Sequence, residues 1–134
     1  MSSLFISANQ IRSLVSMEDA IKAIRSAFIN LSRGDMLVPK RLNLSIPDKN
    51  GIGMIMPAYA FNSPYYTVKT VSINYANPKI GLPLIHATVQ VFDASKGNMI
   101  AIMDGESLTA VRTGAALSLI HISEPTRPRL RSNA

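Results

Sequence analysis

The sequence predicts an α+β fold, with N-terminal helices packed on a mostly antiparallel or mixed sheet. Apolar residues first recur at helical spacing, between residues 16 and 33. From residue 41 to residue 103 the period becomes two, in segments separated by turn residues. Helical spacing returns from residue 105. Strands that follow one another between helices are typical of α+β proteins rather than of alternating βαβ units.

Polar residues mark the start of the two N-terminal helices. Ser7 and Gln10 have the spacing of a capping box, in which each side chain bonds a free backbone N–H. Ser16 repeats the signal and is followed by Glu18 and Asp19, where the helix dipole favours negative charge. The longer helix is predicted over residues 16–33. Its apolar face comprises Ile21, Ile24, Phe28 and Leu31.

Five strands are predicted after Pro39, and turn residues such as Asp48-Lys49-Asn50-Gly51 separate them. A short apolar run at residues 4–6 is expected to form an edge strand. Asp104 is expected to cap a third helix that begins near Gly105. The five predicted strands cover residues 41–46, 52–59, 65–73, 84–93 and 99–103.

Length and composition favour a cytoplasmic protein with one domain. A chain of 134 residues suits a single hydrophobic core. No apolar run approaches the roughly 20 residues that cross a bilayer, and no basic segment precedes an apolar core at the N-terminus. There is no cysteine, which excludes disulfides and thiolate chemistry. We therefore expect no membrane association.

The net charge of +6 does not predict a nucleic-acid partner. Basic residues are scattered, and Lys40-Arg41 is the only adjacent pair ahead of residue 117. A nucleic-acid surface needs clustered Lys and Arg, with aromatic side chains for stacking. A solvated surface explains the charge better.

Most common catalytic and binding signatures are missing from the sequence. His86 is the only histidine before residue 117, so no metal site is expected. The glycines are too dispersed for the G-x-G-x-x-G fingerprint of a dinucleotide site or for a phosphate loop. No Ser-His-Asp triad is indicated.

Three cations stand out by position: Arg41 at the start of a strand, Lys69 inside an apolar strand, and Arg112 in a helix of small residues. A guanidinium matches a carboxylate with two parallel hydrogen bonds, and an ammonium supplies a mobile point charge. If they converge, these cations form a carboxylate-binding pocket. The alternative is that Arg41 and Arg112 pair with surface acids and that the Lys69 ammonium extends to solvent.

A series of motifs resembles the ornithine cyclodeaminase/mu-crystallin family over nearly all of residues 1–116. Each motif is short, but their joint order and spacing are highly specific. The strongest is MDG-x-x-LTA-x-RTGAA, which begins at Met103. The others are Pro39-x-Arg41, Met56-Pro57-Ala58-Tyr59, Val68-Lys69-Thr70-Val71, Asn77-Pro78-x-x-Gly81-Leu82-Pro83 and Val91-Phe92-Asp93 with Gly97.

The resemblance implies a two-domain NAD(P)-dependent enzyme, usually a homodimer. Residues 1–116 would be its substrate-binding and dimerisation domain, and a Rossmann domain that binds most of NAD or NADP would follow. Arg41, Lys69 and Arg112 match residues around the substrate carboxylate, with Lys69 catalytic beside the reacting carbon. Arg112 also matches a position near the nicotinamide. Without the Rossmann domain, the chain alone is expected to be inactive.

The family reaction is hydride transfer at the α-carbon of an amino or imino acid. Members convert ornithine to proline with loss of ammonia, reduce cyclic ketimines such as pyrroline-2-carboxylate, or dehydrogenate alanine. An alternative within the same resemblance is a non-catalytic, mu-crystallin-like protein that binds a small ligand.

Two departures from the family pattern concern specificity. Many relatives have threonine near the cofactor at the position that is Leu84 here. Ornithine-specific members carry an acid at the position of Met54, and a thioether cannot attract a substrate ammonium. Ornithine is therefore not the favoured substrate.

From Leu117 the sequence departs from the family pattern. The string LSLIHISEPTR looks like the translation of a transposase adapter used in sequencing libraries. Pro125 and Pro128 are incompatible with a continuing helix. Residues 117–134 are therefore expected to be a non-native tail with irregular structure.

Overall fold

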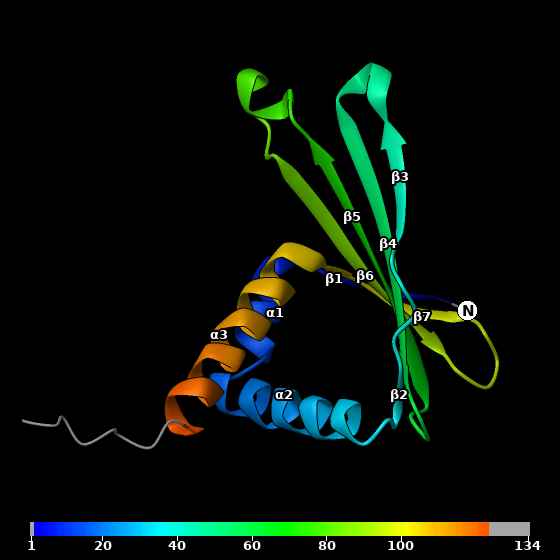
Figure 1. Ribbon diagram of the computed structural model, residues 1–134, viewed down its shortest axis with the longest axis vertical. Helices are drawn as coiled ribbons and strands as arrows, with labels where there is room; N and C mark the ends of the chain where they lie inside the picture. The colour runs from blue at the N-terminus through cyan, green and yellow to red at the C-terminus, as the bar shows by residue number, and fades with distance from the viewer. Residues whose placement is uncertain (1, 124–134) are drawn as a thin grey trace, which may run out of the picture.

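A computed structural model describes residues 2–123 of the chain. Its described part contains a seven-stranded sheet and three α-helices that lie on one side of that sheet (Figure 1). The predicted α+β class is confirmed. In chain order the elements are β1 (Leu4–Ile6), α1 (Ala8–Leu14), α2 (Met17–Ser32), β2 (Met36–Leu37), β3 (Leu42–Ile46), β4 (Gly51–Ala60), β5 (Tyr65–Asn74), β6 (Ile85–Asp93), β7 (Met99–Asp104) and α3 (Gly105–Ser123).

The predicted helix starts are confirmed in atomic detail. Ser7 Oγ accepts a hydrogen bond from the Gln10 backbone N–H at 3.3 Å, and Gln10 Oε1 accepts one from the Ser7 N–H at 2.9 Å. Ser16 Oγ accepts from the backbone N–H of Asp19 at 3.1 Å. α2 therefore begins directly after its predicted cap.

The sheet is mixed because its two ends pair differently. Its order is β1-β7-β6-β5-β4-β2, and β3 also pairs with β4. β1 is parallel to β7, whereas every other pairing within residues 2–123 is antiparallel. The edge strand and the five later strands are confirmed. The two-residue β2, which pairs with the end of β4, was not predicted.

The strand register divides side chains between two faces. Residues directly opposite one another on paired strands point to the same face. One such row crosses four strands: Met56, Lys69, Val89 and Met103. On the other face Tyr66 and Phe92 stack with their ring centroids 4.9 Å apart.

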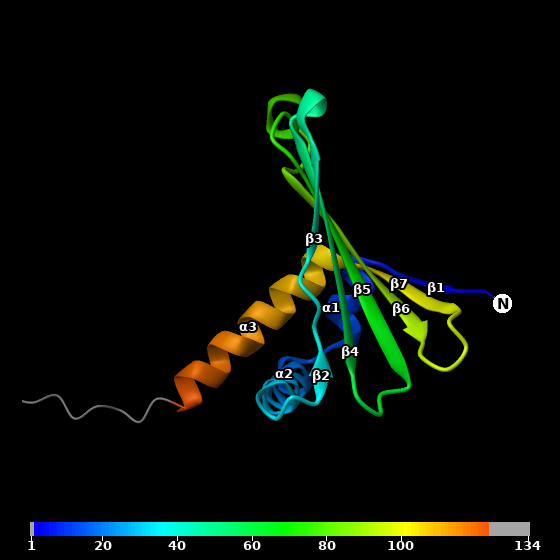
Figure 2. The same ribbon diagram turned by 45° about the vertical axis from the view of Figure 1, so that its right-hand side comes forward.

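The helices form an open layer over one sheet face. α3 packs against β5, β6 and β7, while α1 and α2 pack against α3. α3 diverges from the sheet as it runs toward its C-terminal end (Figure 2). The apolar side chains that this packing buries are Ile11, Ala20, Val71, Val89, Ala101, Ala115 and Leu119.

Many large apolar side chains remain exposed on both layers. On α2, Phe28 is 54% exposed, and on β3 both Leu42 and Leu44 are 62% exposed. Extensive exposed apolar surface is typical of regions that contact another domain or subunit. No helix among residues 2–123 combines the length and the apolar character that crossing a membrane requires.

The C-terminal helix corrects one expectation. α3 continues through Ser123, so the irregular structure expected from Leu117 is wrong for residues 117–123. Ala115 is completely buried, and Leu119 beyond it is 8% exposed, so this part of α3 contributes to the packing. The rest of the expected tail, residues 124–134, lies outside the described residues.

Candidate active site

Lys69 links the sheet to the helical layer. It lies at the middle of β5 on the face that α3 covers, and its side chain is partly buried. Its ammonium Nζ donates a hydrogen bond to Thr109 Oγ1 at 2.7 Å. This short charge-assisted bond joins two elements that are far apart in the sequence.

Arg112 lies one helical turn beyond Thr109, on the same side of α3. Burial, and after it the nearby Arg112 guanidinium, hold the pKa of Lys69 below its ordinary value. The two predicted cations are therefore close enough to repel each other. Such a pair favours an anionic ligand, which would relieve that repulsion.

A cavity of ≈510 Å³ opens beside Lys69. Thr109 and Glu106 line it from α3, and an apolar wall faces them. Leu84 belongs to this wall, and its carbonyl accepts a hydrogen bond from the Asn74 N–H at 3.0 Å, which holds the loop to β5. The structure thus brings Leu84 and Lys69 to one cavity. The apolar wall comprises Val71, Pro83, Leu84, Ile85 and Ala87.

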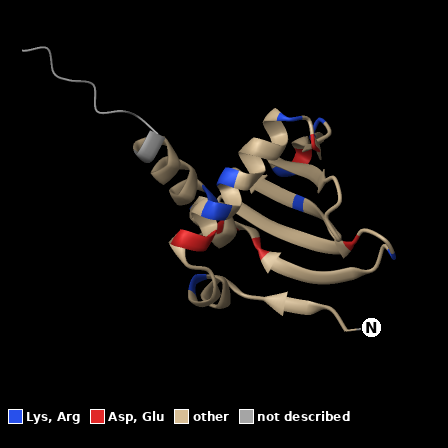
Figure 3. Ribbon diagram, turned by 90° about the horizontal axis from the view of Figure 1, so that it is seen from below, with Lys and Arg blue, Asp and Glu red and all other residues tan. Residues whose placement is uncertain are grey.

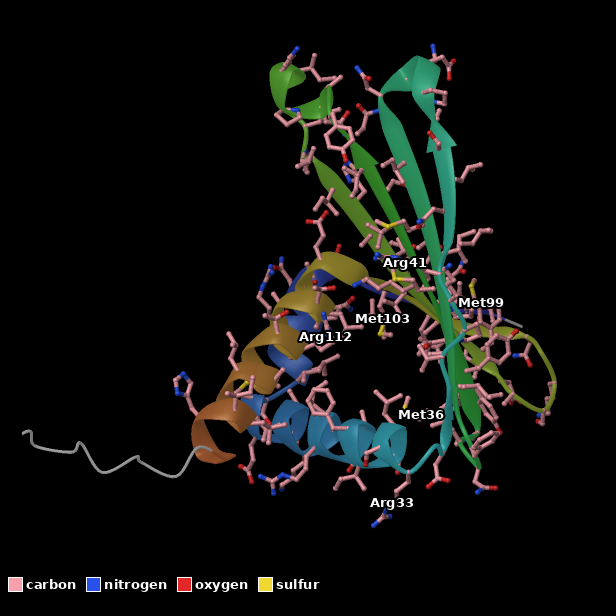
Figure 4. All side chains as sticks on the ribbon, viewed as in Figure 1. Arg33, Met36, Arg41, Met99, Met103 and Arg112 are labelled. Atoms are coloured by element: carbon pink, nitrogen blue, oxygen red, sulfur yellow. The ribbon has the colours of Figure 1, made fainter. Side chains whose placement is uncertain are left out.

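Arg41, the third predicted cation, is not in contact with Lys69. It directly precedes β3, whose first residue, Leu42, lies opposite Ile55. The same register places Arg41 opposite Met56, which lies opposite Lys69, so all three belong to one face of the sheet. Two strand spacings separate the backbones of Arg41 and Lys69 by about 10 Å. In Figure 4, Arg41 lies on the sheet and Arg112 on α3, on facing sides of the space between these layers.

The first turn of α3 is fixed by Asp104, as predicted. The Asp104 carboxylate accepts hydrogen bonds from the Ser107 backbone N–H at 2.9 Å and from the Ser107 hydroxyl. These bonds hold the pKa of Asp104 below its ordinary value. They also set the position of the helix that carries Thr109 and Arg112.

Sequence reasoning did not identify Thr109 or Glu106 as site residues. Thr109 is one of the small residues of the helix that carries Arg112. The available signal was spacing, since Glu106, Thr109 and Arg112 recur every three residues and so share one side of a helix.

The remaining charges are spread over helices, strands and turns rather than gathered on one element (Figure 3). An exposed ion pair between Lys22 and Glu18, at 3.2 Å, is typical of this surface. Within residues 2–123, no group of three or more His, Cys, Asp or Glu side chains is arranged to hold a metal ion.

Comparison with known proteins identifies the family. The family model "Ornithine cyclodeaminase/mu-crystallin family" matches residues 1–121. The Δ1-pyrroline-2-carboxylate reductase of Bacillus cereus is 33% identical over 112 residues, which are 84% of this chain and 34% of the relative. The chain spans about a third of the length of the curated relatives it matches.

Two solved structures share the fold. The Δ1-pyrroline-2-carboxylate reductase of Thermococcus litoralis, in complex with NADH and L-proline, has a TM-score of 0.79 and 35% identity. That match covers 87% of this chain and 36% of the other. An archaeal alanine dehydrogenase dimer with bound NAD has a TM-score of 0.78 and 31% identity over 87% and 35% of the two chains. The fold of this chain is therefore that of one part of each of these two enzymes. The chain belongs to the ornithine cyclodeaminase/mu-crystallin family.

Proposed function

We propose that the complete protein is an NAD(P)-dependent oxidoreductase that transfers hydride at the α-carbon of a small amino or imino acid. The observation that carries this proposal is a partly buried Lys69 that lines a cavity, bonds Thr109 and lies near Arg112, one helical turn further along α3. Two neighbouring cations, one of them partly buried, are suited to a carboxylate. The family relationship supplies the class of reaction.

Each cation has a distinct proposed role. The fork of Arg112 binds the substrate carboxylate through two parallel hydrogen bonds, and Arg41 adds positive charge from the sheet. Lys69 lies beside the reacting carbon. Because its pKa is lowered, its ammonium gives up a proton more readily, and we propose that it protonates the substrate imine nitrogen.

The cavity wall fits the reactive end of a nicotinamide cofactor. Leu84 and Ile85 offer an apolar surface next to Lys69, against which a flat ring can pack. When bound, the nicotinamide supplies or accepts the hydride. Leu84 and Arg112 are the residues of this chain that we propose to contact it. The chain carries no glycine fingerprint, so we propose that a Rossmann domain beyond residues 1–116 holds most of NAD or NADP.

Cyclic ketimines such as pyrroline-2-carboxylate are the substrates that we favour, with alanine as a second possibility. Several relatives above 30% identity are named as pyrroline-2-carboxylate reductases. Met54 lies opposite Val71. This pair is two residues along the strands from Met56 and Lys69, and on the same face of the sheet. The uncharged thioether of Met54 cannot form an ion pair with the side-chain ammonium of ornithine, which disfavours ornithine as the substrate.

We also propose that the complete protein is a homodimer. The alanine dehydrogenase relative is a dimer. On this chain, an apolar patch lies on the sheet face away from the helices. It comprises Leu42, Leu44, Ile46 and Ile55, each at least 38% exposed. Contact with a second copy would remove this patch from water.

The proposal is tested by restoring the gene to the full length of its relatives and measuring NADH and NADPH oxidation with pyrroline-2-carboxylate. We expect Arg112→Ala to lower kcat/KM by about a hundredfold, because a bidentate charged contact is lost. Arg25→Ala, on exposed α2, serves as the matched control. Full activity of the Arg112→Ala protein would contradict the proposal. We also expect no turnover by the 134-residue chain.

A further inference from the structure

The Lys69 side chain requires something to hold it in place. Its four-carbon stem has many rotamers, and fixing it in one of them costs conformational entropy. The neighbouring Arg112 guanidinium repels the ammonium, and burial further disfavours its charge. These effects favour a Lys69 that extends into water. Instead, the ammonium stays at the junction of β5 and α3, bonded to Thr109.

Thr109 supplies the compensating contact. Its Oγ1 accepts a hydrogen bond from the Lys69 ammonium at 2.7 Å, and a hydrogen bond from a charged group is stronger than one between neutral groups. The backbone of Thr109 is held in place, because it lies early in α3, just beyond the Asp104 cap. The hydroxyl therefore fixes the ammonium at one point beside the cavity.

We propose that Thr109 is the positioning residue for Lys69, whose ammonium its hydroxyl holds beside Arg112 at the carboxylate end of the cavity. The inference rests on the proposed function for what the cations do, but the positioning itself is a property of the chain alone. Thr109 would then affect the reaction only by fixing where the Lys69 ammonium lies. The competing explanation is that the Thr109 hydroxyl serves only its own helix, as helical threonines do when they bond a preceding carbonyl.

Two substitutions separate these explanations. Thr109→Val keeps the shape and the β-branch but removes the hydroxyl, whereas Thr109→Ser keeps the hydroxyl and loses a methyl group. Thr88→Val makes the same chemical change at an exposed position on the opposite sheet face and serves as the control. Backbone amide spectra of all four 134-residue chains establish that the fold is retained.

The measurement is the pKa of Lys69, followed through its ¹³Cε chemical shift in lysine-labelled chain and assigned with Lys69→Arg. In Thr109→Val the released ammonium moves toward water and away from Arg112, so its pKa rises toward the ordinary value for lysine. Thr109→Ser and Thr88→Val keep the lowered pKa. An unchanged or further lowered pKa in Thr109→Val, or an equal rise in Thr109→Ser, would overturn the proposal.

A second measurement connects positioning to ligand binding. In the full-length protein, Thr109→Val is expected to weaken L-proline binding about tenfold, while Thr109→Ser stays close to wild type. Equal weakening by both variants would contradict positioning. If wild type binds no L-proline while the pKa result holds, the proposed substrate class of cyclic imino acids fails and the positioning role stands.

Discussion

Gly105, the first residue of α3, lies directly against the backbone of Ala87 on β6. A Cβ atom at Gly105 would be 2.7 Å from the Ala87 carbonyl carbon and 2.8 Å from its Cβ. Real Cβ atoms do not approach backbone so closely. This contact sets how near α3 comes to the sheet, and so how near Thr109 and Arg112 come to Lys69.

The first prediction concerns this close approach. Gly105→Ala should lower the free energy of unfolding by roughly 1–3 kcal/mol, because α3 must shift away from rigid backbone. Gly114→Ala is the matched control on the same helix: the added Cβ meets only the flexible Met17 Cε, at 3.2 Å. The control should change stability by less than about 1 kcal/mol, since improved helix propensity offsets the crowding. Urea unfolding of the three chains checks both. Equal stability of Gly105→Ala and wild type would contradict the contact.

The second prediction concerns the pH dependence of the α3 cap. Hydrogen bonds from Ser107 lower the pKa of Asp104 in the folded state below its unfolded value of about 3.9. The resulting stabilisation is present above about pH 4 and is lost as the pH falls through the lower, folded pKa. Asp104→Asn still caps the helix but does not titrate. Its urea midpoint should therefore fall less than that of wild type between pH 5 and pH 2. Parallel pH profiles would exclude this role.

The third prediction concerns substrate choice at Met54. Met54→Glu places a carboxylate near the row that contains Lys69 and should favour a substrate with a side-chain ammonium. We expect kcat/KM for ornithine, relative to that for proline, to rise about tenfold in the full-length protein, as one added ion pair allows. Met54→Gln has a similar size without the charge and should leave the ratio near wild type. The same rise in both variants would show that charge is not the cause.

The fourth prediction concerns the apolar patch formed by Leu42, Leu44, Ile46 and Ile55. If this patch contacts a second copy, the full-length protein sediments as a dimer, and Leu44→Glu converts it to a monomer because a charge is then buried. Leu31→Glu, at a comparably exposed position on α2, should leave the dimer intact. A monomeric wild type, or a dimer that survives Leu44→Glu, would disprove this interface.

Local signals predicted most of the fold. The Ser7-Gln10 and Ser16 caps and the alternation in β3 to β7 are encoded by neighbouring residues. The features that were missed depend on distant contacts. β2 has two residues and no measurable period, and it exists only because Met36 lies opposite Ala60. Irregular structure is predicted from Leu117 because the sequence departs from the family motifs there, but the apolar residues that follow, Leu119 among them, recur at a spacing that suits a helix.

The candidate site was predictable only in part. The family motifs single out Lys69, Arg112 and Leu84, and the structure places Lys69 near Arg112 and Leu84 at the cavity that Lys69 lines. The bond from Lys69 to Thr109 was not foreseen, because it depends on the angle at which α3 packs on β5. That angle is set by the close contact of Gly105 with Ala87, which no spacing in the sequence reveals.

The most direct test of the proposed reaction follows the hydride itself. The full-length protein is given pyrroline-2-carboxylate and NADH, or NADPH, with deuterium at both C4 positions of the nicotinamide. The account predicts proline with one deuterium at the α-carbon, as read by mass spectrometry and proton NMR. Proline without deuterium at that carbon, or no proline with either cofactor, would contradict hydride transfer to the α-carbon of this imino acid.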